Sequence, residues 1–168
     1  RADILPDTGR LVATAQGNIF VIEAGPEDGP PLLFAHGTAA WSGLWAPVLD
    51  AVSADGRRAV GFDMPPFGFS DHAQDRDYSR PRPAARILAL VNALNIKPIF
   101  VAHSVGAGPS VEAVMQRPEA FAGLVVVSGA LGLGRHEEKA MLPLPLRPAP
   151  LRKSATALTM TNPWLTRT

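Results

Sequence analysis

The fold is decided by residues 100–108, which have the sequence FVAHSVGAG. Residues 99–102 predict a strand, and the apolar spacing of Val111, Val114 and Met115 predicts a helix that ends at Pro118. Ser104 stands between the two. A serine hydroxyl is a weak nucleophile unless it is exposed, aimed and deprotonated by a base. A sharp strand-to-helix turn holds such a serine at the carboxyl edge of a sheet, so this stretch predicts Ser104 as a nucleophile.

The turn around a nucleophilic serine requires small residues two positions before and two positions after it. Ala102 and Gly106 occupy these positions, although the common pattern has glycine at the first of them. Pro109 predicts either a kink or a later start of the helix, because proline lacks a backbone N–H. A small-x-Ser-x-Gly pattern also occurs in ordinary strand-to-helix loops, so further motifs are needed to favour catalysis.

A second motif follows the apolar run Pro31–Ala35, which predicts a buried strand. Gly37 allows the next loop to approach the serine closely. We expect the backbone N–H groups of Thr38 and Val105 to form an oxyanion hole for an acyl-transfer reaction. His36 is a candidate base, but a buried histidine that is hydrogen-bonded to hold the loop is the favoured interpretation.

A third motif is DMPPFGFSD, residues 63–71, in which a strand ends at Asp63 and a tight loop follows. Asp63 is a candidate catalytic acid. We favour a structural role instead, since aspartate commonly accepts hydrogen bonds from the N–H groups of a turn.

The alternation of short apolar runs with helical patterns predicts a three-layer α/β/α sandwich. Its sheet is expected to be mostly parallel, with an antiparallel hairpin formed by residues 10–14 and 18–24. Helices are expected around residues 44–52 and 84–94, and further strands at 58–62 and 124–127. Residues 1–130 are predicted to form this core.

Residues 131–168 differ in character. They combine Leu, Met and Trp with four closely spaced prolines, which break long helices. We predict that this segment begins a cap over the site. Together with Trp41 near the oxyanion loop, the apolar cap predicts a small apolar acyl or aromatic substrate.

The motifs stand in a fixed order along the chain: HGT at 36–38, WAPVL at 45–49, DMPPFGFSD at 63–71 and AHSVG at 102–106. In this order and spacing, residues 10–131 resemble the α/β-hydrolase superfamily, and most closely its cap-bearing esterases. Pro66 stands where the family usually has glycine. The resemblance implies a Ser–His–Asp/Glu triad, with Ser104 as nucleophile and the backbones of Thr38 and Val105 as the oxyanion hole. Gly37, Trp41 and His103 are expected at the substrate.

The resemblance implies that the acid and the histidine follow later strands. His136 follows Ser104 but lies in the cap segment, so it is disfavoured as the base. We expect the chain to be a truncated or cleaved hydrolase, inert or weak alone. A second polypeptide or a remainder of the chain would complete the triad. A core that ends here would leave an unpaired sheet edge.

Several alternatives remain. The same serine would serve an esterase, a C–C bond hydrolase or a perhydrolase, whereas an epoxide hydrolase or haloalkane dehalogenase requires a carboxylate at position 104. A non-catalytic binding module on the same fold is a further possibility, because fold alone does not fix function. A dinucleotide site is disfavoured, since Val111 stands where its glycine pattern needs a third glycine.

Composition narrows the remaining classes. The 168-residue chain has a net charge of +1 and no cysteine, which argues against nucleic acid as a partner and against a thiol nucleophile. No apolar run is long enough for a membrane span, and no metal or cofactor motif is present. We favour a cytoplasmic location, although a start at Arg1 is compatible with a removed signal peptide. Abundant Ala, Gly and Pro suggest a bacterial source.

Overall fold

The structure is a computed structural model that describes residues 5–73, 78 and 81–129. The chain divides into two units, Arg1–Leu131 and Gly132–Thr168, and every described residue belongs to the first. The predicted cap, residues 131–168, therefore lies outside the described residues, as does His136.

The described residues form one six-stranded sheet in the order β1-β2-β4-β3-β5-β6. The strand bounds are β1 Gly9–Thr14, β2 Gly17–Ala24, β3 Pro31–Ala35, β4 Arg58–Phe62, β5 Ile99–His103 and β6 Gly123–Val127. β2 pairs antiparallel with β1 and β4, and the remaining pairs are parallel. The predicted antiparallel start of a mostly parallel sheet is confirmed.

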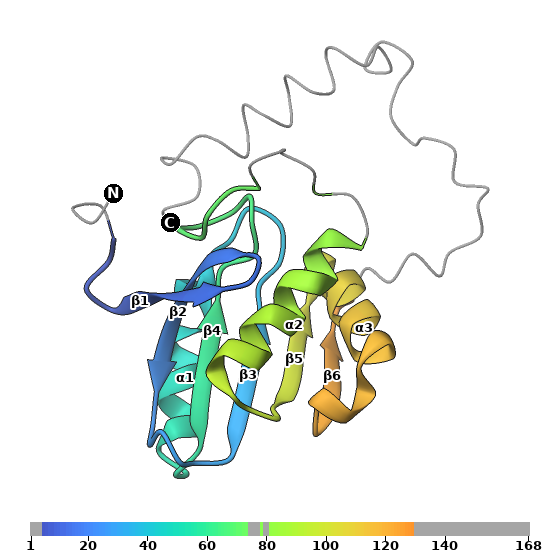
Figure 1. The fold of residues 1–168 in the computed structure, drawn as a ribbon. Helices are drawn as coiled ribbons and strands as arrows, with labels where there is room; N and C mark the ends of the chain where they lie inside the picture. The colour runs from blue at the N-terminus through green and yellow to red at the C-terminus, as the bar shows by residue number, and fades with distance from the viewer. Residues whose placement is uncertain (1–4, 74–77, 79–80, 130–168) are drawn as a thin grey trace. The chain divides into compact units, whose positions relative to one another are not determined.

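Helices cover both faces of this sheet. α1, Ala46–Ser53, lies on one face, and α2, Arg82–Leu94, and α3, Ala107–Gln116, lie on the other (Figure 1). Three short 3₁₀ turns complete the elements: η2 Ser42–Trp45, η3 Ser104–Gly106 and η4 Pro118–Ala120. The predicted three-layer sandwich is confirmed for the part of the fold that the chain covers.

The two faces have separate apolar cores because successive strand residues point to opposite sides. Along β2, Ile19 and Val21 pack with residues of α2 and α3, whereas Phe20 and Ile22 pack with Leu49 of α1. β4 is buried along its whole length, which explains why every residue after Arg58 in this strand is apolar. None of the described helices is long and apolar enough to cross a bilayer.

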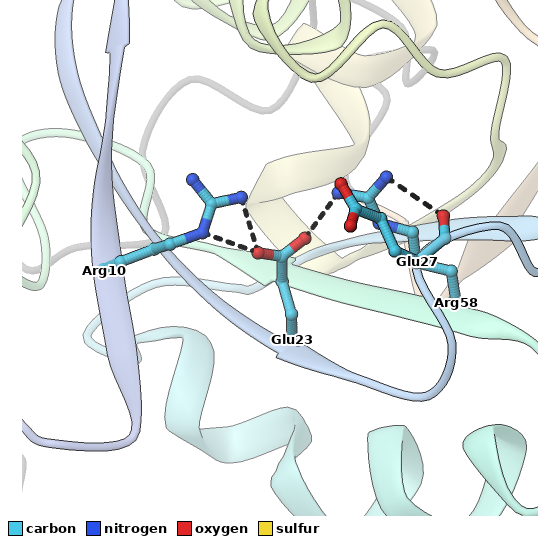
Figure 2. A network of polar contacts seen from close by, with 4 residues as sticks. All are labelled: Arg10, Glu23, Glu27 and Arg58. Atoms are coloured by element: carbon cyan, nitrogen blue, oxygen red, sulfur yellow. Dashed lines mark hydrogen bonds and ion pairs between the residues drawn. The ribbon is translucent and has the colours of Figure 1, made fainter.

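A network of ion pairs joins the three strands at the antiparallel end of the sheet (Figure 2). Arg10 Nε and Arg58 Nη2 donate hydrogen bonds to opposite oxygens of the Glu23 carboxylate, each at 2.8 Å. Arg58 Nη1 also donates to the Glu27 carbonyl oxygen at 3.4 Å. The Arg58 side chain is only 11% exposed, so this network satisfies a largely buried guanidinium.

Candidate active site

Ser104 stands at the carboxyl edge of the sheet, directly after β5 and at the first residue of the η3 turn. Its φ is 53°, in the left-handed region that serine rarely adopts. A non-glycine residue held in this conformation stores roughly 1–3 kcal/mol of strain, and such residues cluster at functional sites. The predicted sharp and strained turn is therefore present at Ser104.

The small residues around the turn are explained by their neighbours. Ala102 is completely buried. A Cβ on Gly106 would lie 2.9 Å from Met64 Cε, and it would also crowd the carbonyl oxygen of His36. The contacts that exclude a side chain at position 106 thus come from the loops that follow β3 and β4. Gly106 lets those loops close against the serine turn.

Pro109 is accommodated by a late start of the helix. The α-helix begins at Ala107, after the η3 turn, so Pro109 lies in its first turn. Backbone N–H groups there have no acceptor within the helix, and proline costs nothing. Of the two outcomes expected from the sequence, the later start is the one observed.

The loop after β3 meets the serine turn at Gly37. A Cβ on Gly37 would lie 3.0 Å from Ser104 Cβ and 3.0 Å from His103 Nδ1, so the backbone of Gly37 lies directly against Ser104. Thr38 is exposed beside it, and Val105 is 44% exposed on the other side. Ala39 follows with φ 56°, a second strained residue in the same place.

The buried side chain of His36 connects this loop to the loop that follows β4. His36 is fully buried, its Nδ1 donates to the Gly37 carbonyl oxygen at 2.8 Å, and its Nε2 accepts from the Met64 N–H at 2.9 Å. Burial lowers the pKa of His36 below 6.5, against smaller opposing effects of the Gly37 carbonyl and the Asp63 carboxylate. Both ring nitrogens are engaged, so the structural interpretation of His36 is confirmed.

Asp63 also has a structural environment. Its buried carboxylate accepts hydrogen bonds from the backbone N–H groups of Ser42, at 2.6 Å, and Phe69, at 2.7 Å. Burial raises the pKa of Asp63, and the hydrogen bonds from Phe69 and Ser42 oppose this effect. Gly68 has φ +66°, and a Cβ there would overlap the carboxylate. The loop therefore wraps tightly around Asp63, as the structural interpretation predicts.

Trp41 and His103, the two side chains predicted at the substrate, have aromatic neighbours. The Trp41 ring meets Phe69 edge-on, with centroids 5.5 Å apart. The His103 ring meets Trp45 edge-on at 6.3 Å. Substrate contacts of Gly37, Trp41 and His103 remain predictions.

Trp45 is the residue whose place the sequence did not reveal. It packs against both Phe34 of β3 and His103 of β5. The sequence analysis used Trp45 only as part of the WAPVL motif. Its position, an aromatic residue just before the start of a helix, could have indicated that it is buried.

Comparisons with known proteins find similar chains among hydrolases. A haloalkane dehalogenase of Psychrobacter cryohalolentis is 26% identical over 121 residues, which cover 71% of this chain and 40% of the relative. An epoxide hydrolase of Caballeronia sordidicola is 31% identical over 112 residues, covering 66% of this chain and 33% of the relative. The crystal structure of the N-acyl homoserine lactonase AidH, complexed with N-butanoyl homoserine, aligns with a TM-score of 0.64 and 28% identity. That alignment covers 72% of this chain and 44% of AidH.

The chain thus spans less than half the length of these three proteins. A family model described as the alpha/beta hydrolase fold matches residues 30–162, which include the Gly37 loop, the Asp63 loop and the serine turn. With the sheet order and the strained serine already described, this match settles the assignment: the chain belongs to the α/β-hydrolase fold family.

Proposed function

We propose that the complete protein is a serine hydrolase that acts on ester or similar acyl bonds, with Ser104 as its nucleophile. One observation carries the proposal: Ser104 is held in a left-handed conformation at a strand-to-helix turn, with the Gly37 backbone against it. Ser104 is half-buried at this turn, and a nucleophilic serine has to be accessible, aimed and deprotonated by a base. The base is expected from the histidine of a triad.

The proposed reaction has two steps. Ser104 Oγ attacks the carbonyl carbon while the base takes the hydroxyl proton, and the oxyanion is stabilised by the N–H groups of Thr38 and Val105. The alcohol then leaves with a proton from the base, so an ester to Ser104 remains. Water, deprotonated by the same base, hydrolyses that ester and releases the acid.

The relatives named haloalkane dehalogenase and epoxide hydrolase raise the question of the bond attacked. Their names denote reactions at an alkyl carbon. Attack of a serine hydroxyl on an alkyl carbon would produce an ether, which water does not cleave under these conditions. Attack on an acyl carbon produces an ester, which turns over. Ser104 therefore favours an acyl substrate, in line with the lactonase named among the structural neighbours.

An apolar acyl or aromatic substrate is the favoured class within this proposal. Trp41, Trp45 and Phe69 pack against the same apolar cluster, and Trp45 also contacts His103, the residue before Ser104. Such rings would contact an apolar acyl chain, while the oxyanion donors would hold its carbonyl oxygen.

The acid and the histidine are proposed to come from the part of the protein that this chain does not span. β6 lies at the sheet edge, and Val125, Val126 and Val127 are 46%, 37% and 40% exposed. Consecutive strand residues face opposite sides, so both faces of β6 are uncovered. A further strand with flanking helices would cover this edge and bring catalytic groups to the same end of the sheet.

The test is covalent labelling of the full-length protein with a fluorophosphonate probe, followed by peptide mass spectrometry. The expected result is one adduct, on Ser104, which Ser104→Ala abolishes. The matched control is Ser128→Ala, because Ser128 is an exposed serine just after the neighbouring strand. Intact, folded protein that gives no adduct at Ser104 would disprove the proposal and favour a binding module.

A further inference from the structure

Two sealed polar atoms lie on rings that contact each other beside the nucleophile. Trp45 Nε1 and His103 Nδ1 are closed off from solvent, and neither has a hydrogen-bond partner among the described residues. Their rings meet edge-on, with centroids 6.3 Å apart and planes at 89°. Each such atom costs roughly 1–3 kcal/mol when it stays unpaired, so a pairing between them is strongly favoured.

The two atoms are chemically complementary. An indole nitrogen only donates a hydrogen bond, whereas an imidazole nitrogen accepts one when the ring proton is on the other nitrogen. No direct bond joins them at the observed positions. A buried water molecule accepts from one group and donates to another, and such waters typically occupy sites between otherwise unsatisfied polar atoms.

The position of the His103 ring is fixed by its surroundings. Trp45 packs against Phe34 with centroids 5.2 Å apart, which anchors the indole to β3. On the other side, a Cβ at Gly37 would lie 3.0 Å from His103 Nδ1. His103 as a residue is only half-buried, and Nδ1 is its nitrogen that is closed off from solvent, so we infer that Nε2 lies on the more exposed side of the ring.

We propose that one water molecule bound between Trp45 Nε1 and His103 Nδ1 holds His103 as the Nε2–H tautomer. His103 then presents an N–H donor at the mouth of the site. Its ligand there is an oxygen acceptor of the substrate other than the carbonyl oxygen held by the oxyanion donors; this second half rests on the proposed function. His103 is in this sense a substrate-contacting residue, and Trp45 is a positioning residue that acts through it.

The tautomer is tested by nuclear magnetic resonance of ¹⁵N-labelled full-length protein. The expected result is a His103 ring protonated on Nε2 only and a Trp45 indole N–H that exchanges slowly with solvent. Trp45→Phe keeps an aromatic ring against Phe34 but removes the donor, so the His103 ring should become a mixture of tautomers. Trp41→Phe is the spectral control, because Trp41 contacts Phe69 rather than His103. A proton on His103 Nδ1, or a tautomer unchanged by Trp45→Phe, would overturn the proposal.

The functional half is tested with acyl substrates that differ only in a second oxygen acceptor. For the substrate with the acceptor, Trp45→Phe and His103→Phe should raise KM about fivefold, the effect of one lost hydrogen bond, while kcat changes little. His103→Gln, which retains an N–H donor, should recover part of the loss. For the substrate without the acceptor, the same variants should raise KM by a clearly smaller factor.

The two proposals fail separately. Absence of labelling at Ser104 with the expected His103 tautomer would disprove the proposed function and leave the Trp45–His103 pair intact. Labelling at Ser104 with the opposite tautomer, or equal KM effects on both substrates, would disprove the inference about His103 alone.

Discussion

At the antiparallel end of the sheet, charged side chains of β1, β2 and β4 pair with one another. The Glu23 carboxylate joins Arg10 and Arg58, β4 is buried along its length, and Phe20, Val21 and Val60 have no exposed surface. At the other end, β5 and β6 leave groups unsatisfied. Three consecutive valines of β6 are exposed, and the ring nitrogens of Trp45 and His103 lack partners within the described residues.

The two ends of the sheet therefore differ in the role that we assign to them: one stabilises the fold, and the other holds the proposed site. At the antiparallel end, β4 and the middle of β2 are buried and joined by ion pairs, whereas the edge strand β1 is partly exposed. Ser104, the proposed nucleophile, follows β5 at the other end, where Val125, Val126 and Val127 of β6 are exposed. The chain spans less than half the length of the three similar proteins, and the proposed function assigns the acid and the histidine to the part that it does not span. Four predictions, each with a matched comparison variant, test this contrast.

The largest effect is expected for Asp63→Ala. This change leaves the buried N–H groups of Ser42 and Phe69 without an acceptor, at a cost of about 3 kcal/mol in the free energy of unfolding. Urea unfolding followed by tryptophan fluorescence measures it. Asp63→Asn, which retains one acceptor oxygen, should lose less. Equal losses for both variants would show that the charge, and not the hydrogen bonds, stabilises the loop.

Gly106→Ala tests the packing beneath the nucleophile. The added Cβ would press on Met64 Cε and on the His36 carbonyl, so we expect a loss of about 2 kcal/mol and slower labelling of Ser104. The control is Gly123→Ala, where the nearest atom, in Ile99, would be 3.9 Å away. The interpretation is wrong if both alanines are tolerated equally.

Replacing one valine by threonine in β4 and one in β6 compares the stability of the two ends of the sheet. Val60→Thr buries a hydroxyl in a completely enclosed position and should cost about 1.5 kcal/mol. Val126 is 37% exposed, so Val126→Thr should alter the stability of this chain by less than about 0.5 kcal/mol. In the full-length protein the Val126 variant should become costlier if a further strand covers β6. A cost that stays the same in both proteins would argue against such a strand.

The smallest effect concerns the ion pairs of Figure 2. Arg58→Met should cost about 1 kcal/mol more than Arg10→Met, because the Arg58 side chain is 11% exposed and that of Arg10 is 53% exposed. Thermal unfolding at low and high salt measures both. Added salt should reduce the effect of Arg10→Met more strongly. Equal costs and equal salt dependence would mean that burial of Arg58 adds nothing.

The sequence predicted the elements of the fold well because their signals are local. Apolar runs predicted β3 and β4, and the small residues around Ser104 predicted the turn. The ion pairs of Glu23 and the contact of Trp45 with His103 could not be predicted. They depend on the lateral order of strands and on side-chain orientations, which no local pattern encodes. For Pro109, the local sequence allowed either a kinked helix or a later helix start. The structure shows the later start, and the turn before this helix packs against Met64.

The left-handed backbone of Ser104 restricts which residues can replace it during evolution. Apart from glycine, this conformation is tolerated best by asparagine and aspartate. An aspartate at position 104 would therefore fit the existing backbone and place a carboxylate where the hydroxyl now stands. The reaction could then move from acyl carbon to alkyl carbon without a rebuilt turn. Under the proposed function, the backbone at position 104 would thus suit either a hydroxyl or a carboxylate, and the similar proteins are named for reactions at both kinds of carbon.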